Sequence, residues 1–196
     1  MEQTLRRTSL SPAQHFTEFV HERKGRYHGR NGRQEPKSYI PPHEIEEYWS
    51  EQNIRTVLKQ CQPHLLADSN AIKANFPLTF SLLVYIDEIE HLGVFLHHDI
   101  DDTKLPLKSR PSALEGLMYD RLWDALYNHQ WTLFPLVIGG RNELADLQLS
   151  HDHVLPFDKE TLLKTGDLAQ IFLVKIHESC NQSPLVRSFP IIHRHR

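Results

Sequence analysis

Residues 155–177, LPFDKETLLKTGDLAQIFLVKIH, decide the fold class of this chain. Within them, residues 170–176 form a short apolar run of β-branched and aromatic side chains, which predicts a β-strand. Residues 154–157 begin another extended segment, and the polar residues around Gly166 predict a loop between the two strands. Because the preceding part of the chain has helical patterns, we expect an α+β fold. It should have a mostly helical block followed by a small antiparallel β element.

Apolar residues spaced three and four positions apart predict the helices. A helix over 12–24 is favoured by Ser11-Pro12, since serine is a good N-cap and proline suits the first helical position. Similar patterns predict helices over 43–49, 51–61 and 112–128, and the sequence FSLLVYIDEIE predicts a buried helix over 80–90. Residues 131–138 are instead an apolar, β-like run that ends at two glycines, which predicts another extended segment.

These patterns divide the chain into four parts. We expect a flexible basic head over 1–38, a helical region over 39–130, a β-rich segment over 131–178 and an irregular tail over 179–196. The first 40 residues hold eight Lys or Arg and four Glu, a net charge of +4. The whole chain has a formal charge of -3, so the remainder carries -3 - 4 = -7.

Length and composition exclude several classes of protein. A chain of 196 residues is expected to form one domain, or one domain with a tail. No apolar run has the length of a signal peptide or of the roughly 20 residues of a membrane span, so we expect no membrane partner. Cys61 and Cys180 are too far apart for a zinc pattern and fit two reduced thiols, which favours an intracellular protein, cytoplasmic or nuclear. Near-neutral charge gives no general argument for nucleic acid.

The densest group of possible metal ligands lies in the Asp-rich loop over 97–105. Imidazole and carboxylate groups are good ligands for zinc, manganese or iron, and this loop holds both types (His97, His98, Asp99, Asp101 and Asp102). Adjacent histidines point in different directions, however, and aspartates in loops commonly cap neighbouring helices. Both interpretations stay open, and His151-Asp152-His153 is a second dense spot. The sequence has no HExxH, Walker or nucleophile-elbow motif.

The loop around Gly166 occupies the place where protein kinases have a glycine-rich phosphate loop. Its three glycine positions contain Lys164, Gly166 and Ala169, and the following valine position contains Ile171. Other landmarks are YIPP at 39–42, EEYW at 46–49, DTKLPL at 102–107 and YNHQW at 127–131. Taken together, residues 39–178 resemble the N-terminal portion of fungal protein-kinase-like proteins, in which a helical region precedes the kinase N-lobe.

The resemblance implies a chain that is truncated before the catalytic residues. Kinase chemistry needs a lysine on the third strand, a catalytic-loop aspartate and a metal-binding aspartate. The twenty residues after Ile176 contain no lysine, and neither aspartate has a counterpart there. A gene break or a splice difference would explain such an end. The resemblance therefore implies no catalytic residue, no cofactor and no nucleotide binding, with Gly166 as a vestigial loop position.

Three functions follow as hypotheses. The first is a non-catalytic, truncated protein-kinase-like protein with a regulatory or interaction role, whose partner is another protein. The second is a helical protein-interaction adaptor unrelated to kinases, which docks through its basic head. The third is a small metal-dependent enzyme that uses the His/Asp clusters.

Overall fold

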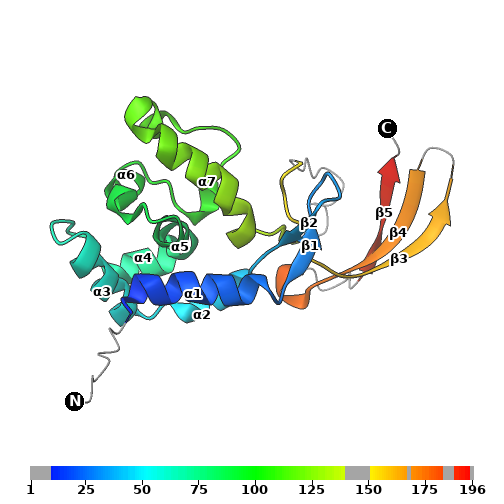
Figure 1. Cartoon of the computed structure of the whole chain (residues 1–196), viewed down its shortest axis with the longest axis horizontal. Coiled ribbons are helices and arrows are strands. Elements are labelled where there is room, and N and C mark those ends of the chain that lie inside the picture. Colours follow the sequence, from blue (N-terminus) through cyan, green and yellow to red (C-terminus); the bar gives the residue numbers. More distant parts are fainter. Residues whose placement is uncertain (1–9, 140–150, 167–168, 183–187, 195–196) are drawn as a thin grey trace, which may run out of the picture.

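The computed structural model describes residues 10–139, 151–166, 169–182 and 188–194, and it confirms the α+β class. Figure 1 shows an elongated molecule with a body of helices at one end and a three-stranded sheet at the other. A small two-stranded hairpin lies between them (Figure 1). The sheet therefore projects from the helical body rather than being enclosed by it.

Seven α-helices lie within the described residues. They are α1 (Pro12–Lys24), α2 (Pro42–Tyr48), α3 (Glu51–Cys61), α4 (Ser69–Asn75), α5 (Pro77–Tyr85), α6 (Leu92–His97) and α7 (Asp120–Leu133). The bounds of α1 and α3 agree with the sequence prediction, and α2 differs by one residue at each end. Helices α4 and α6 were not predicted as separate helices, because each is short and has little apolar periodicity.

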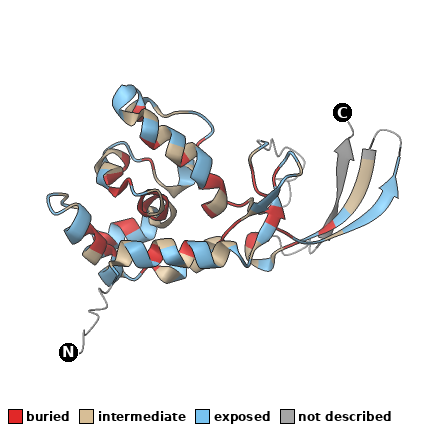
Figure 2. Cartoon of the chain, viewed as in Figure 1, coloured by how far each residue is buried: buried red, intermediate tan, exposed pale blue. Residues whose placement is uncertain are grey.

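Helix α5 is the centre of the helical body. Phe80, Leu82 and Leu83 are almost completely buried although they point to different sides of the helix, and Figure 2 shows α5 surrounded by other helices. The ring of Trp49 packs edge-on against Phe80, and its Nε1 donates to Ser81 Oγ at 2.7 Å. A helix that is apolar all round must be buried. The predicted buried helix is thus confirmed, although it ends at Tyr85 rather than at residue 90.

The expected flexible head is wrong for residues 10–38. Phe16 and Val20 of α1 are fully buried in the helical core. Strands β1 (His28–Arg30) and β2 (Pro36–Ser38) pair antiparallel within the stretch expected to be flexible. The turn between them is built on the buried side chain of Asn31, whose Oδ1 accepts the backbone N–H of Arg33 and Glu35. Residues 1–9 lie outside the described residues.

Helix α7 begins later and ends later than predicted. The predicted helix over 112–128 begins as two short 3₁₀ turns, Ser112–Leu114 and Leu117–Tyr119. At the other end, the predicted β-like run over 131–138 is wrong for its first three residues, which continue α7 to Leu133. The buried amide of Gln130 accepts the N–H of Leu107 at 2.7 Å and donates to its carbonyl at 3.0 Å. This pairing holds the end of the helix against the chain, which the local pattern does not reveal.

The projecting sheet contains β3 (Phe157–Thr165), β4 (Ala169–Ile176) and β5 (Ser188–Arg194) in that order, with both pairs antiparallel. The register places Thr161 opposite Leu173 and Phe157 opposite Ile176. Two predictions need correction. The polar loop expected around Gly166 is mostly strand, because β3 continues to Thr165, and the irregular tail over 179–196 includes β5. Alternation of polar and apolar residues in β3 is weak, so its strand was hard to recognise.

Two hydrophobic cores divide the molecule. The larger core fills the helical body, whereas the smaller one joins the last turn of α7 to the near end of the sheet through Trp131, Val174 and Ile176. The neighbours Tyr39 and Ile40 belong to different cores, so this dipeptide connects them. Within the described residues, no helix is long and apolar enough to cross a membrane.

Candidate functional site

The loop that resembles the kinase phosphate loop lies at the exposed tip of the sheet. Gly166 follows directly after β3, and Lys164 pairs in register with Ile171 of β4. Both Lys164 and Gly166 are exposed, while residues 167–168 lie outside the described residues. A phosphate-binding loop surrounds the phosphates with several backbone N–H groups. Among the described residues, one glycine at an exposed turn supplies no such enclosure.

The Asp-rich loop caps helices. The Asp102 carboxylate accepts the N–H of Leu78 at 2.8 Å and both the N–H and the hydroxyl of Thr79, at 2.8 and 2.7 Å. Burial raises the pKa of Asp102, and these hydrogen bonds oppose the rise. Asp101 accepts the N–H and the hydroxyl of Thr103, and its hydroxyl bond is the main reason that the pKa of Asp101 is lowered. The capping interpretation is therefore confirmed for both aspartates.

The structure does not gather this loop around one point. His97 and His98 are exposed, with their rings edge-on at 4.8 Å between centroids. Asp99 has a positive φ of 51°. Since Asp101 and Asp102 are occupied as caps, these five residues do not converge as metal ligands within the described part of the chain.

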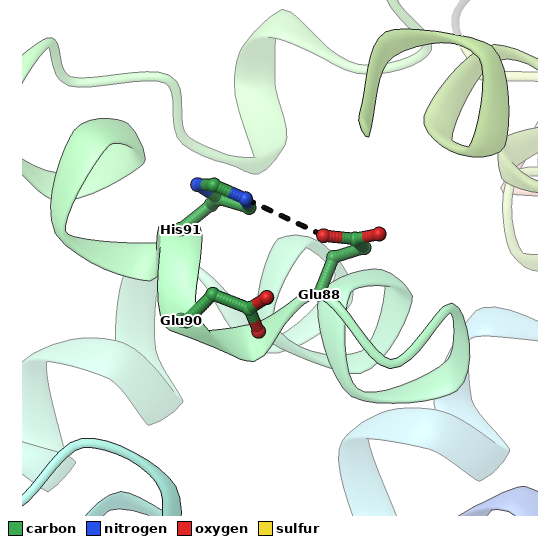
Figure 3. A group of neighbouring side chains, drawn as sticks. All are labelled: Glu88, Glu90 and His91. Atoms are coloured by element: carbon green, nitrogen blue, oxygen red, sulfur yellow. Dashed lines mark ion pairs between the residues drawn. The ribbon is translucent and has the colours of Figure 1, made fainter. Parts of the chain in front are cut away.

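A different group of possible ligands does converge, at the turn after α5. Glu88, Glu90 and His91 each place a ligand atom within 4.8 Å of the other two, and Figure 3 shows the three side chains facing a common space. The turn begins at Asp87, which has a φ of 59°, and continues into the 3₁₀ turn Ile89–His91. This change of direction moves the three side chains off the axis of α5 and brings them together.

The charge of Glu88 is already balanced. Its side chain is only 8% exposed, and its Oε1 lies 3.1 Å from Arg121 Nε of α7. Its Oε2 lies 3.4 Å from His91 Nε2, and the His91 ring packs edge-on against Tyr119. A buried carboxylate needs such compensation. Chemically the three donors suit a divalent cation. The contacts of Glu88 with Arg121 and His91 already engage two of them and connect the turn after α5 to α7. The sequence shows three titratable groups within four residues, but nothing in it identifies Arg121 as their partner.

The second dense histidine spot lies beside a polar pocket between α7 and the β1–β2 hairpin. His153 is buried with its ring 4.8 Å from Trp131, and Tyr127 Oη donates to the Asp152 carboxylate at 3.3 Å. The pocket has a volume of about 340 Å³ and mixes aromatic, amide and charged side chains. Its lining includes Lys37, Tyr127, Asn128, Trp131 and Asp152. Ser38 also lines the pocket, and its Oγ lies 3.5 Å from His28 Nδ1, at the limit of a hydrogen bond.

A second serine–histidine pair is closer together. His177 Nδ1 lies 2.6 Å from Ser179 Oγ, but the same nitrogen also faces the Ser179 N–H at 3.4 Å. This is the arrangement of a cap for the turn Glu178–Cys180. Cys180 beside it is fully buried, and burial raises the pKa of its thiol to about 11. A buried thiol with a high pKa is unreactive.

Comparison with known proteins gives no relative. No family model, curated protein or solved structure matches the chain.

Proposed function

We propose that this chain is a non-catalytic protein of the protein-kinase-like type, which acts by binding another protein through its projecting sheet. The observation that carries the proposal is the exposure of large apolar residues on that sheet. Leu162 is 50% exposed, Leu163 is 56% exposed and Leu173 is 38% exposed. Leu162 is opposite Phe172 and Leu173 is opposite Thr161, so Leu162 and Leu173 lie on opposite faces of the outer part of the sheet. Large apolar residues exposed on a surface commonly mark a site of protein contact.

Strand β4 buries one of its two faces in the smaller core and leaves the other exposed. Successive residues of a strand face opposite sides, so Val174 and Ile176 point to one side while Leu173 and Lys175 point to the other. Val174 and Ile176 are buried in the smaller core, whereas Leu173 and Lys175 are exposed. Figure 2 shows the exposed surface continuing along β3. Since β3 is at one edge of the sheet, a partner could also pair with its backbone.

The kinase-like part of the proposal is supported by the order of the strands. The antiparallel strands β3 and β4 follow a helical region, and Gly166 comes directly after β3. That is the arrangement which the resemblance implies for the start of a kinase N-lobe.

A nucleotide titration tests the non-catalytic part. The melting temperature of the purified chain should be unchanged by magnesium-ATP, because a ligand that does not bind the folded state cannot stabilise it. A concentration-dependent increase would contradict the proposal. The variant Gly166→Asp serves as a matched control, since an increase that it abolishes must come from this loop.

An affinity experiment tests the binding part. The wild-type chain and the double variant Leu162→Asp/Leu163→Asp should be compared as bait in a quantitative pull-down. We expect the variant to lose the partners that the wild type retains. The control is Leu10→Asp, because Leu10 is also an exposed leucine but lies at the start of the helical body, far from the sheet along the chain. Equal recovery of partners by the sheet variant and the wild type would overturn the proposal.

A further inference from the structure

Two adjacent apolar side chains are exposed at the start of α7, at the opposite end of the molecule from the sheet. Leu117 is 89% exposed and Met118 is 76% exposed, and both belong to the 3₁₀ turn Leu117–Tyr119. Gly116 precedes them with a φ of 111°, a conformation that favours glycine. We call Leu117 and Met118 the apolar tip.

A guanidinium group fixes the loop that carries the apolar tip. Arg110 Nε donates to the Leu114 carbonyl at 2.6 Å, and its other two nitrogens donate to the Gly116 carbonyl at 2.8 Å and to the Asp120 carboxylate at 2.6 Å. These bonds hold the chain on both sides of the tip. A loop that is already fixed loses little conformational entropy on binding, so the tip is preorganised for contact.

An apolar groove lies on the same helical body, between α3 and the start of α4. Its volume is about 430 Å³, and its apolar lining includes Leu58, Leu65 and Leu66. Leu66 is fully exposed. Figure 1 shows that the start of α7 and the end of α3 are both at the helical end, away from the sheet.

The charges beside the tip and the groove are opposite. Glu115 is exposed next to the tip, and in the described part of the chain it has no ion-pair partner. Lys59 is exposed on the lining of the groove and likewise has no carboxylate within ion-pair distance among the described residues. The other two charged groups of the lining are already engaged, since Arg55 pairs with Glu51 and the Asp68 carboxylate accepts the N–H of Asn70 at 2.9 Å.

We propose that the apolar tip of one copy of this chain binds in the apolar groove of a second copy, with Glu115 facing Lys59. Because tip and groove are on the same end of the molecule, two copies can exchange both contacts about a two-fold axis. Such an exchange closes a dimer, which is the commonest symmetry of soluble oligomers. The occupant is a second copy because this chain itself supplies both the apolar match and the opposite charge.

Sedimentation velocity of the full chain over a range of concentrations tests the dimer. The wild type should convert from monomer to dimer as its concentration rises. Leu117→Asp should raise the dissociation constant at least about tenfold, because a carboxylate would have to be buried in the apolar groove. The matched control is Leu163→Asp on β3, which should dimerise like the wild type. A wild type that stays monomeric, or a Leu117→Asp variant that dimerises normally, overturns the proposal.

A charge exchange tests the pairing of the two surfaces. Glu115→Lys and Lys59→Glu should each weaken the dimer several-fold, since each places like charges together. The double variant with both changes should recover much of the wild-type affinity. If the double variant does not recover dimer affinity, the proposed pairing of Glu115 with Lys59 is overturned. If Leu163→Asp abolishes the dimer while Leu117→Asp does not, the association belongs to the sheet, and the proposed function survives while this inference fails.

Discussion

Asp102 is the residue whose contribution to stability is easiest to isolate. Its carboxylate satisfies two backbone N–H groups at the start of α5, the helix at the centre of the body. We expect Asp102→Ala to reduce the free energy of unfolding by about 2 kcal/mol, because the cap is lost and the N–H groups are left without an acceptor. Urea denaturation measures the change. Asp101→Ala is the matched control, since Asp101 caps only a single short turn. An equal loss of unfolding free energy in both variants would contradict this assignment.

Cys180 makes the stability depend on alkaline pH. In the unfolded chain its thiol has its ordinary pKa of 9.0, and burial raises this to about 11 in the folded protein. The unfolded state therefore releases its proton first, so stability is fully present below pH 9 and falls as the pH rises toward 11. The two-unit difference limits the loss to about 2–3 kcal/mol. Burial raises the pKa of Tyr39 as well and adds to the fall.

Replacement of Cys180 by alanine should reduce this alkaline loss. Urea midpoints of the wild type and of Cys180→Ala should approach each other as the pH rises from 8 to 11. A constant difference between the two proteins at every pH would show that the thiol is not the titrating group. Cys61→Ala is the comparison variant, because Cys61 is exposed, although partial burial raises the pKa of its thiol as well.

At the scale of the elements, the β1–β2 hairpin depends on a close approach at Gly29. A Cβ at this position would lie 2.2 Å from the backbone carbonyl oxygen of Leu155, which cannot move aside like a side chain. We therefore expect Gly29→Ala to cost at least about 2 kcal/mol, measured by chemical denaturation. Gly93→Ala is the control, because its Cβ would meet only Leu65 at 3.5 Å and a helical alanine is favoured by up to about 1 kcal/mol. An equal change in unfolding free energy in Gly29→Ala and Gly93→Ala would argue against the close approach.

The elements also show what local pattern can and cannot predict. Helices α1 and α3 were predictable because Ser11 and Ser50 cap them and apolar residues recur at helical spacing within them. The end of α7 was not, because it depends on Gln130 bonding to Leu107, 23 positions away along the chain. The candidate sites likewise divide into those that depend on local sequence and those that depend on distant residues. The caps at Asp101 and Asp102 were among the interpretations that the sequence allowed, whereas the group around Glu88 depends on Arg121, which only the packing of α7 against the turn supplies.

At the scale of the whole molecule, the uneven burial of the sheet predicts uneven hydrogen exchange. Backbone amides near Val174 and Ile176, beside the smaller core, should exchange slowly, while those near Leu162 and Ile171 should exchange at least tenfold faster. Among the residues of β3 and β4 whose burial is described, few buried apolar contacts hold the outer part, so it can open locally. Hydrogen exchange measured by mass spectrometry on peptides from β3 and β4 distinguishes the inner part of the sheet from the outer part. Uniformly slow exchange along both strands would mean that something covers the outer part, and uniformly fast exchange would mean that the smaller core does not hold the sheet.

Helix α7 has a further consequence for how the protein can be dissected. Leu122 and Leu126 lie in the larger core, whereas Trp131, one further turn along the helix, lies in the smaller one. The sequence pattern changes from helical to β-like at residue 130. A fragment boundary placed there would cut α7 and separate side chains that belong to the same core. Fragments split there should be insoluble when each is expressed alone, and co-expression should be needed to recover them. The helical body and the sheet thus look like separate parts, but we expect that neither folds when it is expressed without the other.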